Sequence, residues 1–188
     1  MADVSVRPAR AGDAAEIGRI QIDTWRTGYA ALLAPAVLEA LSAQYAAAAW
    51  RDAVLQPPSG RHHVLVALEQ QRVVGFAACG PADDPEPAGT LSVNPLLVEP
   101  RWGRRGHGSR LLAACVDHAR ADGMTRAIVW LPEGDNASRT FFTSAGWGQD
   151  GMTRGLDTGA GELREIRLTV LLDDDPPADD ARTGGGAP

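Results

Sequence analysis

The sequence has 188 residues and contains no lysine, since all 18 of its basic residues are arginine. Without lysine, the chain cannot use a lysine Schiff base or the lysine of a Walker A phosphate loop. It has only two cysteines, Cys79 and Cys115, and no CxxC spacing, so we expect no disulfide framework. Its four histidines are scattered, and we therefore predict no metal site.

Long apolar runs are also missing from the sequence. No stretch approaches the roughly 18 apolar residues that a membrane span needs, and the first residues, MADVSVRPAR, lack the apolar centre of a secretory signal. We therefore expect a cytoplasmic protein with no membrane partner. The formal charge is −6, and most of it comes from the five aspartates of residues 173–188. The near balance elsewhere argues against binding nucleic acid through bulk charge.

Hydrophobic periodicity predicts one mixed α/β domain over residues 1–172. Helices are expected at 11–29 (capped by Asp13, with Glu16 three residues on), 34–55, 108–121 and 135–145. Strands are expected at 3–9, 62–69, 72–80, 90–98, 125–131 and 161–172, and a further strand near Trp147 is left open. Pro95 lies inside one strand, which suggests a bulge or a place where neighbouring strands part. Residues 173–188 are acidic, rich in glycine and proline, nearly without apolar side chains, and predicted to be disordered.

A glycine-rich and arginine-rich turn joins the strand at 90–98 to the helix that follows. It holds three glycines and four arginines: Gly103, Gly106, Gly108, Arg101, Arg104, Arg105 and Arg110. The first amides of a helix lack intrahelical partners, and glycine lets a ligand approach the backbone closely, so the turn suits a diphosphate. On the loop alone, a plain turn with solvated arginines explains the sequence equally well. The Rossmann fingerprint fails because Leu111 stands where its third glycine belongs.

Two segments resemble the GNAT superfamily of acyl-CoA N-acyltransferases. LLVEPRWGRRGHGSRLL, from Leu96, matches that family's pyrophosphate-binding signature through Val98-Glu99-Pro100 and Gly106-His107-Gly108. VWLPEGDNASRTFFTSAGW, ending at Trp147, matches its next strand and helix. The resemblance implies a mixed, mostly antiparallel sheet of six to seven strands with helices on both faces. It also implies that the strands at 90–98 and 125–131, the family's fourth and fifth, splay apart.

The match departs from the family pattern at three positions. Gly103 stands where the family has Gln or Arg, so Arg101 or Arg104 would have to replace that contact. Asp135 stands at the family's asparagine. Phe142 replaces a frequent tyrosine that can protonate the departing thiolate, which puts the usual general acid in doubt.

The resemblance implies that acetyl-CoA is a co-substrate bound in the gap between the two splayed strands. The residues expected to contact it are Leu96, Leu97, Val98, Gly103, Arg104, Arg105, Gly106, His107, Gly108, Ser109, Arg139 and Phe142. The amide of Leu97 or Val98 would polarise the thioester carbonyl. Phe142 either packs beside the thioester or is an ordinary core aromatic.

An amine acceptor must lose a proton before it attacks, so a base is expected. Glu99 is the first candidate, followed by Asp83, Asp84, His62 and His63, each of which is more typical of a surface residue. Trp25 and Tyr29 are four residues apart on one helical face and are candidates for the wall of an acceptor pocket, with core packing as the alternative.

The activity implied is transfer of an acetyl group from acetyl-CoA to a primary amine, by direct attack through a tetrahedral intermediate. The acceptor would be a small molecule or a peptide amine, and a homodimer is possible because it is common among similar proteins. The main alternative is an acyl-CoA-binding sensor or scaffold that has lost catalysis. Acyl transfer to oxygen, or transfer of a longer acyl chain, is a further alternative.

Overall fold

The computed structural model describes residues 4–83 and 85–172, so the predicted disordered tail and Asp84 lie outside the described residues. The helices are α1 (Ala14–Gly28), α2 (Pro35–Ala40), α3 (Ala43–Leu55), α4 (His107–Ala121) and α5 (Asn136–Ser144), with 3-10 turns η1 (Ala11–Asp13) and η2 (Pro100–Trp102). The strands are β1 (Val4–Pro8), β2 (His63–Glu69), β3 (Arg72–Pro81), β4 (Thr90–Val98), β5 (Arg126–Pro132), β6 (Gly148–Asp157) and β7 (Glu162–Leu171).

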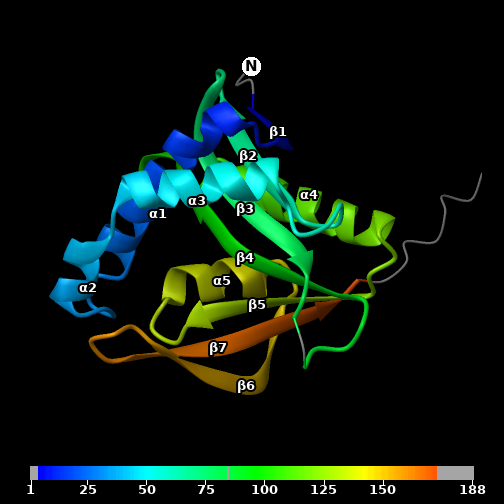
Figure 1. Cartoon of the computed structure of the whole chain (residues 1–188). Coiled ribbons are helices and arrows are strands. Elements are labelled where there is room, and N and C mark those ends of the chain that lie inside the picture. Colours follow the sequence, from blue (N-terminus) through cyan, green and yellow to red (C-terminus); the bar gives the residue numbers. More distant parts are fainter. Residues whose placement is uncertain (1–3, 84, 173–188) are drawn as a thin grey trace, which may run out of the picture.

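The strands form one seven-stranded sheet in the order β1-β2-β3-β4-β5-β7-β6. Every neighbouring pair is antiparallel except β4 and β5, which are parallel. Figure 1 shows α1 and α3 crossing one face of the sheet, while α4 lies behind it. The predicted α/β fold, with a mixed and mostly antiparallel sheet and helices on both faces, is therefore confirmed.

Each face of the sheet has its own hydrophobic core. Leu111, Cys115 and Phe142 of α4 and α5 pack with Val74 and Ala77 of β3 on one face. On the other face, the apolar side of α1 packs against Val73 and Phe76 of the same strand, next to Leu97. Strand β3 is thus buried on both sides, which explains its nearly continuous apolar sequence.

The strands β4 and β5 pair over only three residues, from Thr90–Arg126 to Ser92–Ile128, and then separate. The register between β3 and β4 shifts at the same place, because Ala77 faces Leu96 while Cys79 faces Val93. Two residues, Asn94 and Pro95, thus stand opposite Ala78 alone. The bulge and the parting that Pro95 suggested are both present, and they open the gap that the resemblance implied.

Two local predictions were wrong. The helix expected at 34–55 is two helices, because Leu41 and Ser42 are extended and the Ser42 hydroxyl accepts a hydrogen bond from the Tyr45 amide to start α3. Asp13 precedes α1, but its carboxylate does not cap that helix. It accepts hydrogen bonds from the Arg7 guanidinium at 2.7 Å and from the Arg10 amide instead.

The open question at Trp147 is settled in favour of a strand, since β6 begins at Gly148 and pairs with β7. Among the described residues, no helix combines the length and the apolar character needed to cross a membrane.

Candidate functional site

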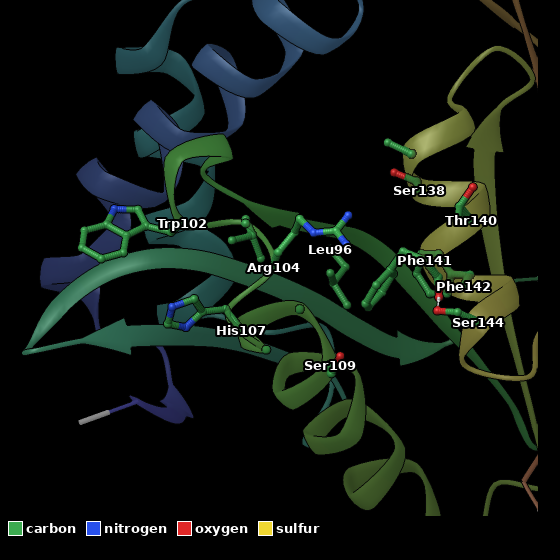
Figure 2. A pocket seen from close by; sticks show the side chains of 15 residues that line it. Leu96, Trp102, Arg104, His107, Ser109, Ser138, Thr140, Phe141, Phe142 and Ser144 are labelled. Carbon is green, nitrogen blue, oxygen red and sulfur yellow. Dashed lines mark hydrogen bonds between the residues drawn. The ribbon is translucent and has the colours of Figure 1, made fainter. Parts of the chain in front are cut away.

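A first cavity of about 630 Å³ lies between the start of α4, the end of β4 and one face of α5. Figure 2 shows its two sides: Trp102, Arg104 and His107 belong to the turn that leads into α4, and Phe141, Phe142 and Ser144 project from α5. Leu96 and Val98 of β4 form the floor. The cavity therefore opens along the part of β4 that β5 leaves unpaired.

The backbone of the turn is shaped as a cradle. Gly106, the residue before α4, has φ +82°, and Arg104 also has a positive φ of +62°. The amides of His107, Gly108 and Ser109 have no carbonyl partner within the helix because they belong to its first turn, and no side chain of the described residues caps α4. All three residues line the cavity. A Cβ on Gly106 would lie 2.7 Å from the Arg110 guanidinium, and one on Gly108 would lie 3.2 Å from the Phe141 ring. The positive φ favours glycine at position 106, and a Cβ at position 108 would need the Phe141 ring to shift.

Buried polar groups lie under the cradle. The His107 side chain is almost fully buried, and its Nε2 lies 3.0 Å from a carboxylate oxygen of Glu69 on β2. Arg105 lies over the Trp102 ring at 4.8 Å, with its guanidinium 3.9 Å from the same carboxylate. The indole N–H of Trp102 is buried without a hydrogen-bond partner among the described residues. The site thus offers backbone amides, the Trp102 N–H and the Arg104 guanidinium, which fits a ligand with phosphate groups.

A second cavity of about 410 Å³ lies beside the same gap. Asn94 and Pro95 of β4 and Trp130 and Pro132 of β5 form the part of its wall nearest the gap, and α1 and α2 close the other side. Leu96 and Val98 face the first cavity, whereas Asn94 and Pro95 face the second. The bulge in β4 therefore separates the two cavities.

The exposed edge of β4 carries free amides at this place. The Glu99 amide donates to the Val74 carbonyl on β3, and successive amides of a strand point to opposite edges. The Val98 amide consequently points away from β3, into the gap, while that of Leu97 points toward β3. Of the two candidates from the sequence, the geometry favours Val98 as the donor to a thioester carbonyl.

One contact joins the two cavities. The Tyr29 hydroxyl, in the second cavity, donates to the Asp135 carboxylate at 3.3 Å. The same carboxylate accepts from the hydroxyl of Ser138, which lines the first cavity, at 2.7 Å. Burial, and then the negative charge of Asp135, raise the pKa of Tyr29 well above its ordinary value. The Tyr29 hydroxyl therefore keeps its proton at neutral pH.

The model of the acetyltransferase (GNAT) family matches residues 25–147 of the chain. This range includes β4, which lines both cavities, and α4 and α5, which line the first. The chain belongs to the GNAT acetyltransferase family. A Bacillus subtilis protein described as the uncharacterized N-acetyltransferase YuaI is 30% identical over 142 residues, covering 74% of this chain and 77% of the relative.

Solved GNAT structures share the fold. The PaiA N-acetyltransferase of Thermoplasma acidophilum, in complex with coenzyme A, has a TM-score of 0.72 at 13% identity and covers 90% of this chain and 99% of its own. YncA of Salmonella typhimurium, with its cofactor acetyl-CoA, has a TM-score of 0.68 at 20% identity, and the match covers 95% of this chain and 99% of YncA. A ribosomal-protein-alanine N-acetyltransferase from Brucella melitensis has a TM-score of 0.69 at 20% identity and covers 89% and 99%.

Most of the residues that the sequence assigned to acetyl-CoA meet in the first cavity of this GNAT domain. They are Leu96, Val98, Gly103, Arg104, Gly106, His107, Gly108, Ser109 and Phe142. Phe142 lines the cavity, and its ring packs edge-on against Phe141 and Trp147 in the core, as expected of a core aromatic. Its packing beside the thioester stays a prediction. Trp25 and Tyr29 both line the second cavity, with their rings stacked at 6.2 Å.

Other predicted cofactor residues lie elsewhere. The Leu97 side chain packs in the core on the α1 side of the sheet. Arg105 contacts Trp102 and Glu69, and Arg139 is hydrogen-bonded to Asn136 on the exposed side of α5. None of these three side chains lines the first cavity.

The candidate bases that the structure describes are also outside both cavities, and Asp84 is not among the described residues. Glu99 is buried in ion pairs with Arg19 at 3.1 Å and with Arg101 at 2.9 Å. Burial raises the pKa of Glu99, but hydrogen bonds from the two arginines outweigh it and hold the pKa below its ordinary value. This placement does not support Glu99 as the base. Asp83, His62 and His63 line neither the first nor the second cavity.

Sequence reasoning missed several residues of the first cavity: Trp102, Ala137, Ser138, Thr140, Phe141 and Ser144. Helical spacing from Phe142 was a usable signal, because Ser138 lies one turn before it on the same face. Ser144 and Thr140 share the adjacent row in the same way. No comparable pattern marks Trp102, which lies in a short 3-10 turn.

Proposed function

We propose that the protein transfers the acetyl group of acetyl-CoA to a primary amine. The observation that carries the proposal is the parting of β4 from β5, with the cationic cradle on one side of the gap and the aromatic cavity on the other. A nucleotide thioester in the first cavity and an amine in the second would meet at the gap. Two reactants held in this way need no further collision to react.

The first cavity supplies the groups that acetyl-CoA requires. The free amides of residues 107–109 and the Arg104 side chain would hold the diphosphate. The pantetheine arm would lie along the unpaired edge of β4 over Leu96 and Val98. Its amide groups suit an unpaired strand edge, which offers matching donors and acceptors.

The reaction is a direct attack of the amine nitrogen on the thioester carbonyl. A new N–C bond forms and the C–S bond breaks, the nitrogen gives one proton to solvent water, and the thiolate leaves with the bonding electrons and is protonated from solvent. The Val98 amide would donate to the oxygen as it gains negative charge. A thiol has a pKa of about 8.5, so its thiolate can leave without full protonation. The presence of Phe142 in place of a tyrosine is therefore compatible with turnover.

The alternative is an acyl-CoA-binding domain without catalysis. Phe142 is the observation that favours it, since the side chain facing the cavity at this position has no proton to give. The two functions differ in one measurement. A catalyst releases free coenzyme A from acetyl-CoA only when an amine is added, whereas a sensor binds acetyl-CoA and releases none with any amine.

We predict that Gly106→Asp abolishes binding of acetyl-CoA while the protein stays folded. The substitution adds a carboxylate at the cradle and forces a residue with φ +82° to carry a Cβ against Arg110. Gly123→Asp is the matched control, because Gly123 follows the other end of α4, has φ +70° and has nothing within 4 Å of the point where its Cβ would lie. Calorimetric titration with acetyl-CoA should detect binding in the control and none in Gly106→Asp.

Circular dichroism should show the same folded spectrum for both variants. An affinity in Gly106→Asp equal to that of Gly123→Asp would contradict the cradle. Amine-dependent release of coenzyme A by the unchanged protein tests the second half of the proposal, and its absence with every amine would favour the sensor.

A further inference from the structure

The second cavity carries information about the chemical class of the acceptor. It is enclosed by α1, the segment around α2, and the strands β4, β5, β6 and β7. Its volume of about 410 Å³ is in the range of small-molecule sites, so a small ligand fits it better than a folded protein surface would.

The walls of this cavity are largely apolar. Three aromatic side chains face it, Trp25, Tyr29 and Trp130. The rest of the apolar wall comes from Leu33, Val37, Leu41, Pro95, Pro132, Leu156 and Leu163. Such walls stabilise a ligand by burying its apolar surface, and they offer few partners to the peptide groups of a polypeptide acceptor.

The cavity is lined by two carboxylates and one cation among the described residues. Among the described residues that line it, Arg154 is the one cation, and it is paired with a carboxylate of the same cavity. Its Nε lies 2.6 Å from a carboxylate oxygen of Glu165, and the group stacks over the Trp130 ring at 4.4 Å. Asp157 adds a second carboxylate. An acceptor with its own carboxylate would therefore meet a cation that Glu165 already neutralises, and the Asp157 carboxylate would repel it.

The carboxylates of the cavity also limit the number of positive charges that a bound acceptor can carry. Arg154 neutralises Glu165, so only Asp157 is left over, and the Gly159 amide donates to it at 2.8 Å. One net negative charge favours the approach of one ammonium group. A polyamine with several positive charges would have to bury the remainder against aromatic and aliphatic walls, which is costly.

We propose that the acceptor is a small primary amine with an apolar body and no carboxylate, of the arylalkylamine type. The inference rests on the proposed acetyltransferase function and adds the substrate class. The aromatic walls of Trp25, Tyr29 and Trp130 hold the apolar body, and the amino group lies toward the gap at Asn94 and Pro95.

The first test compares matched amines with saturating acetyl-CoA. Phenethylamine and phenylalanine differ only by a carboxylate, spermidine represents polyamines, and a short peptide with an N-terminal alanine represents peptide acceptors. We expect kcat/KM for phenethylamine to exceed that of each of the others by about tenfold or more. Equal or better turnover of phenylalanine, spermidine or the peptide overturns the inference but leaves the acetyltransferase function standing. No turnover of any amine overturns both.

The second test places a cation inside the cavity. Val37 of α2 lines the cavity, whereas Ala40 of the same helix is exposed and does not. Val37→Lys should lower kcat/KM for phenethylamine about tenfold relative to Ala40→Lys, because the new ammonium repels the acceptor's charge. The ratio of kcat/KM for phenethylamine to kcat/KM for phenylalanine should be smaller in Val37→Lys than in Ala40→Lys. KM for acetyl-CoA should be the same in both variants. Identical amine kinetics in Val37→Lys and Ala40→Lys would overturn the assignment of this cavity.

Discussion

At the scale of single residues, the site depends on a few backbone positions more than on charged side chains. The sequence around Gly103 offers four arginines for the cradle, yet only Arg104 lines the cavity. Arg101 pairs with Glu99, Arg105 stacks on Trp102, and Arg110 donates to the Arg105 carbonyl. The amides at the start of α4 are therefore the main donors, and the arginines largely stabilise the loop that presents them.

Tyr29 allows a prediction about pH. Its hydroxyl is held neutral by burial and by Asp135, so its pKa in the folded protein lies above that of the unfolded chain. A group with a raised pKa contributes stability that is fully present below the unfolded pKa, about 10 for tyrosine, and is lost as the pH rises toward the folded value. The free energy of unfolding should therefore fall as the pH rises above about 10.

The chain has two tyrosines, and Tyr45 is 81% exposed, so Tyr45→Phe leaves Tyr29 as the one reporter. In this variant, the folded protein should show little phenolate absorbance near pH 11, whereas the urea-unfolded protein should show most of it, because that pH is about one unit above the unfolded pKa. Nearly complete ionisation of Tyr29 near about pH 11 in the folded state would contradict its burial and its contact with Asp135.

At the scale of the elements, the acceptor side depends on how closely α1 packs against α3. A Cβ on Gly18 of α1 would lie 2.6 Å from the backbone nitrogen of Ala47 on α3. Backbone atoms cannot move aside as a flexible side chain can, so the two helices would have to separate. This packing sets the position of the α1 face that carries Trp25 and Tyr29 into the second cavity.

We predict that Gly18→Ala lowers the free energy of unfolding by about 1–3 kcal/mol, the usual cost of overpacking. Gly28→Ala is the control on the same helix, since nothing lies within 4 Å of its Cβ position. It should leave stability unchanged or raise it by up to about 1 kcal/mol, because alanine favours helix. Urea denaturation of both variants measures the difference, and equal stabilities would contradict the close contact.

The elements also show what the sequence could predict. Pro95 predicted the bulge and the parting of the strands because a proline cannot donate within a ladder, and both are local consequences of one residue. Gly106 predicted the cradle in the same way. The break at Ser42 was hidden because an alanine-rich sequence continues on both sides and helix propensity alone favours one long helix.

At the scale of the whole molecule, the features that the sequence did not predict are long-range contacts. Tyr29 and Asp135 are 106 residues apart, and only the assembled sheet brings α1 and α5 together around the gap. The pairing of Glu99 with Arg19 spans 80 residues, and it turned a candidate base into a structural ion pair. In both pairs, the sequence around one residue gives no sign of its partner, so periodicity and motif spacing could not reveal these contacts.

The arrangement of the whole domain gives the two cavities their relation. Parallel pairing of β4 and β5 ends early, antiparallel pairing of β5 with β7 continues, and the gap is left between the two halves of one sheet. The homodimer, which is common among similar proteins, stays a prediction for this chain, and sedimentation of the purified chain would test it. The catalytic proposal needs only residues of one chain.

A crystal structure of the protein with coenzyme A tests the central claim most directly. The account predicts that the diphosphate oxygens lie within hydrogen-bond distance of the amides between residues 104 and 109, with the sulfur near Val98 in the gap. A nucleotide bound in the aromatic cavity, or anywhere away from the start of α4, would contradict it.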